Sequence, residues 1–233
     1  MCPESKPRQL PLDLVHPEGR SRDHLVVSDA NAAAVALIDG WPQWPSPVVV
    51  LAGPTGSGKS HLGAIWQEMS GAIAVDRREV GEADAVADKG AALFIDDADA
   101  GGLDETGLFH AVNAVRAANS HMLLTARRFP AAWGVDLPDL ASRLKAAATV
   151  EIREPDDILL SGVIAKLFAD RQVEVEPSVV QYLVRRIERS LATAIRVVEK
   201  LDTAALEQKT RITRVLAAEV VSALDEGQRE LDL

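Results

Sequence analysis

The segment GPTGSGKS, at residues 53–60, constrains the fold of this chain more than any other part of the sequence. It matches the pattern G-x-x-x-x-G-K-[ST]. It follows the aliphatic run VVVLA (Val48–Ala52), whose β-branched residues are typical of a buried parallel strand, and it precedes a predicted helix from Lys59 to about Met69. A strand, a glycine-rich turn and a helix in this order predict a phosphate-binding loop, because the glycines let backbone N–H groups point toward phosphate oxygens.

This phosphate loop predicts that the chain binds a nucleotide, ATP or ADP, together with Mg²⁺. We expect the Lys59 ammonium to bind the β- and γ-phosphates and the Ser60 hydroxyl to bind Mg²⁺. The N-terminus of the helix that follows adds a positive end to the site. The other predicted nucleotide-binding residues of the loop are Gly53, Pro54, Thr55, Gly56, Ser57 and Gly58.

A second hydrophobic run, LFIDD at residues 93–97, ends in two carboxylates. Asp96, at the end of the predicted strand, is placed to bind Mg²⁺, and Asp97 is a candidate catalytic residue that would orient an attacking water. The alternative is an ordinary strand end whose turn happens to be acidic. Beside a phosphate loop, the Mg²⁺ role is favoured for Asp96.

Strands alternate with helices as far as Glu154. The predicted strands are residues 48–52, 71–76, 91–97, 121–126 and 149–152, and the predicted helices between them are 29–38, 59–69, 104–119 and 138–144. This alternation predicts an α/β fold with a central parallel sheet.

After Glu154 the hydrophobic residues recur at helical spacing, which predicts a small all-helical domain. The four apolar stripes are Leu160, Val163, Ile164 and Leu167; Val179, Val180, Leu183 and Ile187; Leu191, Ile195, Val198 and Leu201; and Val215, Leu216 and Val220. We therefore divide the chain into a leader of residues 1–23, an α/β nucleotide-binding domain of residues 24–154 and a helical domain of residues 155–233.

The overall charge and the cysteine content exclude several classes of protein. The chain has a formal net charge of −10, whereas duplex-DNA binders are normally basic, so any contact with DNA is expected to be indirect. Its single cysteine, Cys2, forms no internal disulfide and fits a reducing compartment. No apolar run approaches the roughly 18 residues of a membrane span. The chain is predicted to be a soluble cytoplasmic protein that makes no contact with membranes.

Three segments, GPTGSGKSHL, LFHAVNAV and LPDLASRL, resemble the AAA+ ATPases and, more narrowly, the DnaA/Hda family. The resemblance covers roughly residues 24–225, and it implies an AAA+ P-loop domain followed by a helical lid. It adds His61 and Thr125 to the nucleotide-binding residues, and it implies that the chain could form a homo-oligomer. Arg143, in LASRL, matches the family's arginine finger, which acts in trans by offsetting charge on the γ-phosphoryl group of a neighbouring subunit's nucleotide.

Two positions depart from the pattern of this family. Family members carry an acidic residue after the third strand, at the position called sensor I, where this chain has Arg127. They carry an arginine near the start of the third lid helix, called sensor II, where this chain has Ala192, with Arg189 and Arg196 about one turn away on either side. Losing a cation over the phosphates implies weak intrinsic ATP hydrolysis. Arg143 is unaffected, because it acts on a partner's nucleotide.

The leader contains QLPLDL at residues 9–14, which resembles the hexapeptide by which Hda-type members bind the sliding clamp of the replicase. In an extended peptide, Leu10, Leu12 and Leu14 lie on one face and can fill an apolar groove, while Gln9 supplies a polar anchor. The alternative is a leader that packs on its own domain.

The resemblance therefore implies a clamp-associated regulator that stimulates hydrolysis of ATP bound to the DnaA initiator and represses re-initiation of replication. We expect no DNA-reading domain after the lid, and a location at the replisome in the cytoplasm. One alternative is a helicase-loader or transposase-accessory ATPase, which would not bind the clamp. The other is a stand-alone P-loop kinase, against which the separate helical domain counts.

Overall fold

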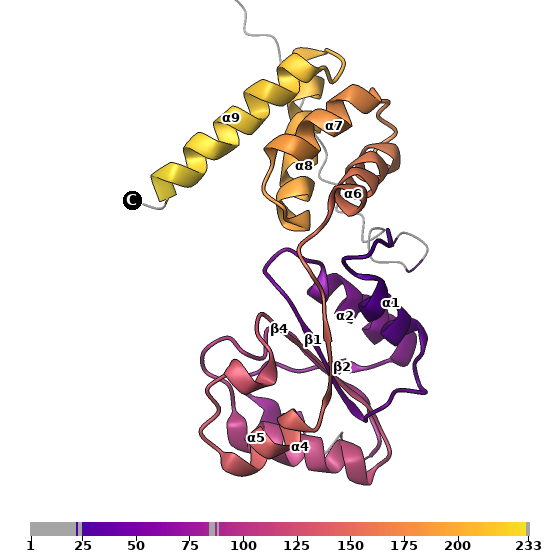
Figure 1. The fold of residues 1–233 in the computed structure, drawn as a ribbon, viewed down its shortest axis with the longest axis vertical. Helices are drawn as coiled ribbons and strands as arrows, with labels where there is room; N and C mark the ends of the chain where they lie inside the picture. Colours follow the sequence, from indigo (N-terminus) through magenta and orange to yellow (C-terminus); the bar gives the residue numbers. More distant parts are fainter. Residues whose placement is uncertain (1–21, 23–24, 84–86, 88, 232–233) are drawn as a thin grey trace, which may run out of the picture.

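The computed structural model describes residues 22, 25–83, 87 and 89–231. The elements of the base, in chain order, are α1 (Ala32–Asp39), β1 (Val48–Ala52), α2 (Lys59–Ser70), β2 (Ile73–Ala74), η3 (Val80–Ala83), β3 (Leu93–Ile95), α4 (Glu105–Ala117), β4 (Met122–Ala126), η4 (Pro130–Ala132), α5 (Pro138–Lys145) and β5 (Ala148–Glu151). The lid follows, with α6 (Asp157–Asp170), α7 (Pro177–Arg186), α8 (Leu191–Gln208) and α9 (Arg214–Leu231). The lid lies at one end of the base, so that the molecule is elongated (Figure 1).

A parallel sheet of five strands forms the centre of the base, in the order β2-β3-β4-β1-β5. β1 and β4 pair along their full length, from Val48 opposite Met122 to Ala52 opposite Ala126. Every residue of these two strands is buried, which explains why their sequences are hydrophobic throughout. Because the strands are parallel, β1, β3 and β4 all end at the same edge of the sheet, which we call the carboxyl edge. The predicted α/β fold is confirmed.

Helices cover both faces of the sheet. Leu51 and Leu123 pack with α1 and α2 on one face. Their neighbours Val50 and Leu124 pack with α4 and α5 on the other. This alternation follows from the pleat of a strand, in which successive side chains point to opposite faces. The side of the sheet on which a strand residue lies can therefore be read from its position in the strand.

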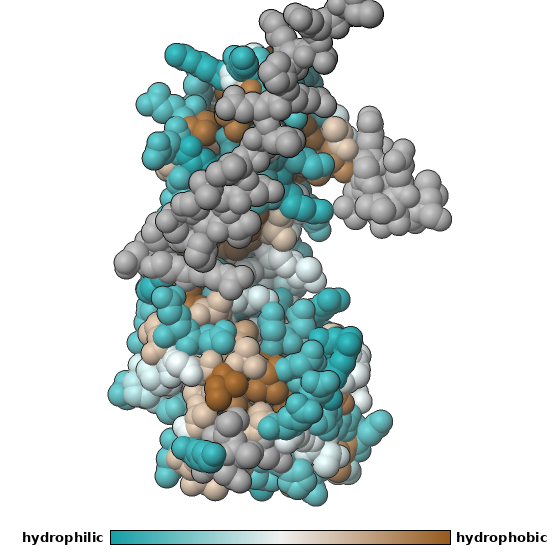
Figure 2. Space-filling view, turned by 180° about the vertical axis from the view of Figure 1, so that it is seen from behind, coloured by the Kyte–Doolittle hydropathy of each residue, from teal (hydrophilic) through white to brown (hydrophobic). Residues whose placement is uncertain are grey.

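The four helices α6 to α9 pack around a hydrophobic core of their own, to which each of them contributes. Side chains cap three of them. The Asp156 carboxylate accepts a hydrogen bond from the Leu159 N–H (2.7 Å) at α6, the Ser190 hydroxyl accepts one from the Thr193 N–H (3.3 Å) at α8, and the Thr213 hydroxyl accepts one from the Leu216 N–H (3.4 Å) at α9. Seen from behind, an apolar patch is visible on the base (Figure 2). The helical lid predicted from the four apolar stripes is thus present.

Three residues of those stripes, Val163, Ile195 and Val215, do not belong to the lid core. Ile195 is 39% exposed and Val215 is 69% exposed. Both lie on helices whose other apolar residues already fill the core, so helical spacing alone did not decide which of them were buried.

The first predicted helix and the second predicted strand are shorter than expected. The helix begins at Ala32 and not at Asp29, because Ser28 accepts a hydrogen bond from the Ala30 N–H (3.1 Å) and Asn31 accepts one from the Ser28 N–H (2.9 Å). These side chains stabilise a turn that competes with the helix. β2 contains only two residues, and both are exposed at the edge of the sheet.

Asp156 joins the lid to the base. In addition to capping α6, its carboxylate accepts hydrogen bonds from the Ser28 hydroxyl and from the backbone of Ala30, both of which belong to the base. Burial acts to raise the pKa of Asp156, but the hydrogen bonds outweigh it and hold the pKa below its ordinary value. The ionised carboxylate is therefore the form that stabilises this junction.

Candidate nucleotide-binding site

The predicted phosphate loop lies between β1 and α2 at the carboxyl edge of the sheet, at the end of the base that faces the lid (Figure 1). The Gly53 N–H donates to the Ala126 carbonyl oxygen (3.1 Å), which continues the β1–β4 pairing into the loop. A Cβ atom on Gly53 would lie 2.1 Å from the Ile152 carbonyl oxygen, so only glycine fits there. Gly56 and Gly58 have φ angles of +75° and +98°, in the region that glycine adopts without strain. The glycines of the motif are thus required by the path of the backbone.

Ser57 and Lys59 are polar residues buried within this loop, with exposures of 2% and 5%. The Lys59 ammonium donates to the Pro54 carbonyl oxygen at 2.8 Å. Within the described part of the chain, the Ser57 hydroxyl has no hydrogen-bond partner. A buried hydroxyl without a partner is costly, and a phosphate oxygen would supply the missing acceptor. The loop therefore fits an anionic group such as a nucleotide phosphate.

The pKa of Lys59 is lower than the ordinary value for a lysine. Burial is the main cause, and the like charge of Arg127 adds to it. The carboxylates of Asp97, Asp96 and Asp99 act in the opposite direction. The position thus disfavours a positive charge when no anion is bound, and a phosphate beside the ammonium would reverse that effect.

A chain of hydrogen bonds, which we call the Thr125 network, connects the phosphate loop to the predicted acidic residues. The Ser60 hydroxyl donates to Asp96 Oδ1 at 3.0 Å, and the Thr125 hydroxyl donates to the same oxygen. The Thr125 oxygen also accepts from the Asp97 N–H at 2.9 Å. The residues expected to bind Mg²⁺, Ser60 and Asp96, are in direct contact. Thr125 is fully buried and lies behind the two carboxylates, so we propose that it positions them.

Asp99 is a residue of this edge that sequence reasoning missed. Its carboxylate accepts hydrogen bonds from the backbone N–H groups of Arg127 (2.9 Å) and Arg128 (3.1 Å), and its side chain is only 2% exposed. Asp99 thus places a carboxylate beside Arg127 from the neighbouring strand end. The only sequence signal was the acidic run DDAD at residues 96–99.

The start of α8 contacts the phosphate loop directly. The Leu191 N–H donates to the Gly56 carbonyl oxygen at 2.8 Å, and a Cβ atom on Gly56 would lie 2.1 Å from the Ser190 hydroxyl oxygen. Ala192, at the sensor II position, is the next residue of this helix and is exposed. The lid therefore meets the loop through backbone atoms and small side chains.

The two arginines on either side of Ala192 have partners within the lid and its junction. Arg189 donates to the Pro155 carbonyl oxygen at 3.1 Å and to Asp157 Oδ1 at 2.7 Å. Arg196 donates to the Thr193 hydroxyl at 3.2 Å. Arg189 thus stabilises the start of α6, and Arg196 stabilises the first turns of its own helix.

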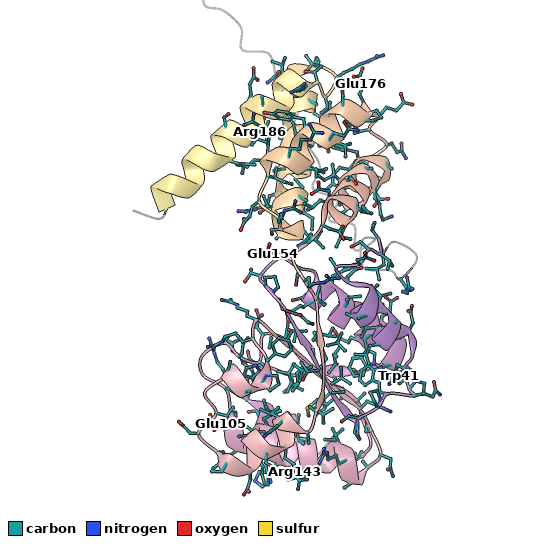
Figure 3. All side chains as sticks on the ribbon, viewed as in Figure 1. Trp41, Glu105, Arg143, Glu154, Glu176 and Arg186 are labelled. Atoms are coloured by element: carbon teal, nitrogen blue, oxygen red, sulfur yellow. The ribbon has the colours of Figure 1, made fainter. Side chains whose placement is uncertain are left out.

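Arg143 lies far from this site, at the end of the base remote from Glu154, where the chain passes into the lid (Figure 3). It is exposed, and its guanidinium has no hydrogen bond or ion pair within the described residues. The helix that carries it is firmly attached: the Glu105 carboxylate accepts from the backbone N–H groups of Asp136 (3.0 Å) and Leu137 (2.8 Å) at the start of α5. Arg143 therefore cannot reach the nucleotide of its own chain.

Of the remaining predicted site residues, His61 is half-buried in the first turn of α2 and Thr55 is exposed on the loop. The proposed clamp-binding residues Gln9, Leu10, Leu12 and Leu14 lie outside the described residues.

A nucleotide-associated Mg²⁺ fits the donors at the carboxyl edge. Mg²⁺ is usually held by one or two protein oxygens together with substrate phosphates and waters. Ser60 and Asp96 supply such oxygens. In the described part of the chain, no group of three or more His, Cys, Asp or Glu residues could hold a metal by itself. In the same residues, no helix is both long and apolar enough to cross a membrane.

Comparison with known proteins relates the helical lid to one family. Residues 164–220 match the family described as "Hda, lid domain". An uncharacterized protein of Haemophilus influenzae is 26% identical over 110 residues, which are 47% of this chain and 48% of that protein, so the match spans about half of its length.

Solved structures share the fold. Domain III of the replication initiation protein DnaA from Thermotoga maritima superposes with a TM-score of 0.73 at 16% identity, covering 88% of this chain and 97% of that one. DnaA from Aquifex aeolicus, bound to AMPPCP, superposes with a TM-score of 0.69 at 17% identity, covering 84% of this chain and 68% of that one. At these identities the structures establish the fold and no shared activity.

The lid match, the parallel sheet with its phosphate loop and the DnaA-like arrangement of base and lid lead to one conclusion. The chain has a DnaA-like AAA+ fold, and its helical lid matches the Hda lid family.

Proposed function

We propose that this chain is a nucleotide-binding regulator of DNA replication that acts on the DnaA initiator. It presents Arg143 to ATP bound by DnaA, accelerates hydrolysis of that ATP and so represses re-initiation. The Hda lid match and the DnaA-like fold support a role in replication. The finer role rests on the chemistry of individual residues.

The placement of Arg143 is the observation that carries the proposal. Its guanidinium is exposed, has no partner among the described residues and lies at the opposite end of the base from the chain's own phosphate loop (Figure 3). A guanidinium stabilises the charge that develops on a transferred phosphoryl group only when it touches that group. Arg143 can therefore assist phosphoryl transfer only on a nucleotide held by another subunit.

The chain's own nucleotide has a different task in this proposal. ATP or ADP would be held by Lys59 and the loop backbone, with Mg²⁺ at Ser60 and Asp96. The Leu191 N–H donates to the Gly56 carbonyl oxygen. A ligand that changes the conformation of the loop would therefore also change the position of the lid relative to the base. The nucleotide would thus set the orientation of the lid relative to the base, and its hydrolysis would not be needed.

The leader segment QLPLDL would tether the protein to the sliding clamp through Gln9, Leu10, Leu12 and Leu14. Clamps are loaded onto DNA during synthesis, so this tether would couple the switching-off of DnaA to active replication. It would also place the protein at the replisome, with DNA bound only through the clamp.

The test follows hydrolysis of radiolabelled ATP already bound to DnaA, with clamp loaded on DNA, in the presence and absence of this protein. Acceleration is expected from the natural chain. Arg143→Ala should reduce the accelerated rate by roughly 10³-fold, the effect expected of an arginine finger. The Leu10/Leu12→Ala double variant removes the proposed contacts with the clamp. If hydrolysis by the natural chain depends on clamp, this variant should not accelerate it.

Lys145→Ala is the matched control, because Lys145 is another exposed cation in the last turn of the same helix. It should accelerate hydrolysis as well as the natural chain does. Equal rates for Arg143→Ala and Lys145→Ala would contradict the role of Arg143. Acceleration that is independent of clamp would contradict the tether.

A further inference from the structure

We propose that the lid binds the phosphate backbone of duplex DNA through a group of arginines beside Tyr182. Two of them lie in the last turn of α7, and two lie at or just before the start of α9. The group, which we call the Tyr182 cluster, consists of Tyr182, Arg185, Arg186, Arg211 and Arg214. This inference goes beyond the proposed function, in which DNA is reached only through the clamp.

Two guanidiniums of the cluster lie over one aromatic ring. The Cζ atom of Arg186 is 5.8 Å from the centroid of the Tyr182 ring, and the Cζ atom of Arg214 is 5.1 Å from it. Arg186 is one turn from Tyr182 on α7, whereas Arg214 begins α9, which packs against α7. The ring itself is half-buried against the lid core. It therefore holds two cations from different helices at one place on the surface.

Acidic residues do not neutralise this cluster. Its four arginines are exposed, and none of them has a side-chain hydrogen bond or an ion pair with any side chain that the structure describes. Arg211 and Arg214 line a surface depression of about 1090 Å³ together with Glu174 and Glu176, but no carboxylate there comes within ion-pair distance of them. Like charges held together repel each other, so the cluster favours an anion from outside the chain.

Folding does not explain the two arginines next to α9. The N-terminus of a helix is its positive end, so a cation there lowers the stability of the helix. Arg214 is nevertheless the first residue of α9, and Arg211 comes shortly before it. The cap of this helix is a neutral group, the Thr213 hydroxyl, which accepts from the Leu216 N–H at 3.4 Å. A bound anion would offset both the two cations and the positive end of the helix.

The chemistry of the cluster suits the phosphates of duplex DNA. A guanidinium stays charged and binds a phosphate through two parallel N–H donors, and a duplex presents phosphates in a dense, regular array. The Tyr182 ring supports cations rather than unpaired bases, which favours a duplex over a single strand. An anionic membrane is bound by helices with a continuous apolar face. On α9, only Val215 is an exposed apolar residue beside Arg214 in the described first turn.

The position of the cluster is compatible with the proposed action on DnaA. Arg186 lies on the lid, whereas Arg143 lies at the far end of the base (Figure 3). A lid that touches DNA would therefore leave Arg143 free to face a partner. Because the chain has a net charge of −10, its attraction to DNA should be weak, and a tether to a clamp on DNA would raise the local concentration enough for contact.

Fluorescence anisotropy of a short labelled duplex tests the proposal on the full chain, without clamp or DnaA. The natural chain should bind at about 50 mM salt and lose affinity steeply towards about 200 mM, because phosphate contacts release counterions. The Arg186→Ala/Arg214→Ala double variant should weaken binding about tenfold at the lower salt. It should also reduce the slope of log K against log salt by about 2, one unit for each phosphate contact.

The Arg196→Ala/Lys200→Ala double variant is the matched control. It removes the same charge from exposed positions on α8, another helix of the lid. If the Tyr182 cluster is the binding surface, this variant should bind the duplex as the natural chain does. Equal weakening in both double variants would show a diffuse attraction to charge and would overturn the inference.

Two further results would also overturn it. One is a natural chain that does not bind the duplex at the lower salt. The other is a natural chain that binds vesicles of phosphatidylglycerol and not the duplex, which would assign the cluster to a membrane surface. Arg186→Gln/Arg214→Gln, which keeps long polar side chains, gives the same decision should the alanine variant unfold. None of these measurements involves DnaA, clamp or nucleotide, so their failure is distinct from a failure of the proposed regulatory role.

Discussion

The carboxyl edge of the sheet and the exposed face of α5 both carry residues proposed to act on nucleotides, but they are built in opposite ways. At the carboxyl edge, Ser60, Asp96, Thr125 and Asp97 are joined by successive hydrogen bonds, and the loop beside them touches the lid. On α5, Arg143 is exposed and has no partner within the described residues. In the function proposed above, the first site binds its nucleotide within a single chain, whereas Arg143 acts only on a nucleotide that a second protein supplies.

This difference has a consequence for mutations. A side chain within a buried network contributes to folding and to binding, so the two effects cannot be separated there. An exposed side chain without partners contributes little to folding, so its removal should affect function alone. Measurements of stability can therefore show whether the two regions are as different as the structure indicates.

Thr125→Val should produce the largest loss of stability. Valine has the shape of threonine but cannot bond Asp96 or the Asp97 N–H, so the half-buried Asp97 N–H would lose its partner and Asp96 would keep only the Ser60 hydroxyl. We expect a decrease in the free energy of unfolding of about 2–3 kcal/mol, measured by urea denaturation. Arg143→Ala, measured in the same way, should lie within about 0.5 kcal/mol of the natural chain. Similar losses in both variants would remove the distinction between the two regions.

Gly56→Ala tests whether the lid packs tightly against the phosphate loop at the carboxyl edge. An alanine Cβ would lie 2.1 Å from the Ser190 hydroxyl oxygen and 2.9 Å from Ser190 Cβ, so the lid would have to move. We expect a loss of about 2 kcal/mol in stability, from this contact and from the left-handed backbone.

Gly71→Ala separates these two causes. Gly71 also has a positive φ, +67°, but no heavy atom lies within 4 Å of an added Cβ there. The Gly71→Ala variant should therefore lose only the part of the unfolding free energy that comes from the left-handed backbone, about 1 kcal/mol. Equal unfolding free energies for the two variants would show that the lid does not press on the loop.

The pH dependence of the Asp156 junction should be the smallest effect. Hydrogen bonds lower the pKa of Asp156 in the folded chain, so its contribution is complete above the unfolded value of about 4 and disappears as the pH falls through the folded value. Asp156→Ala should cost about 1 kcal/mol at pH 7, and this difference from the natural chain should shrink below pH 4.

Glu176→Ala is the control for that titration, because Glu176 stands at the start of α7 without capping it. Its difference from the natural chain should not depend on pH in the same way. A loss for Asp156→Ala that is constant from pH 7 to pH 3 would show that the ionised carboxylate is not what joins lid and base.

The sequence by itself determined most of the elements. The phosphate loop was predictable because its glycines, Lys59 and Ser60 are consecutive and lie between a β-branched run and a helix. The lid helices were predictable because their apolar residues recur at helical spacing. Element ends were less predictable, as at Asn31, where a side chain bonds to the backbone and delays α1.

Only the tertiary structure decided which residues meet. Asp99 and Arg127 are separated by 28 positions in the chain, and they come together because parallel strands end at one edge. The orphaned Ser57 hydroxyl, the partners of Arg189 and the isolation of Arg143 likewise depend on the packing of distant segments. Periodicity in a sequence reports the local environment of a residue. Its hydrogen-bond partners depend on the register of the strands and on how the lid packs against the base, and no local pattern encodes these.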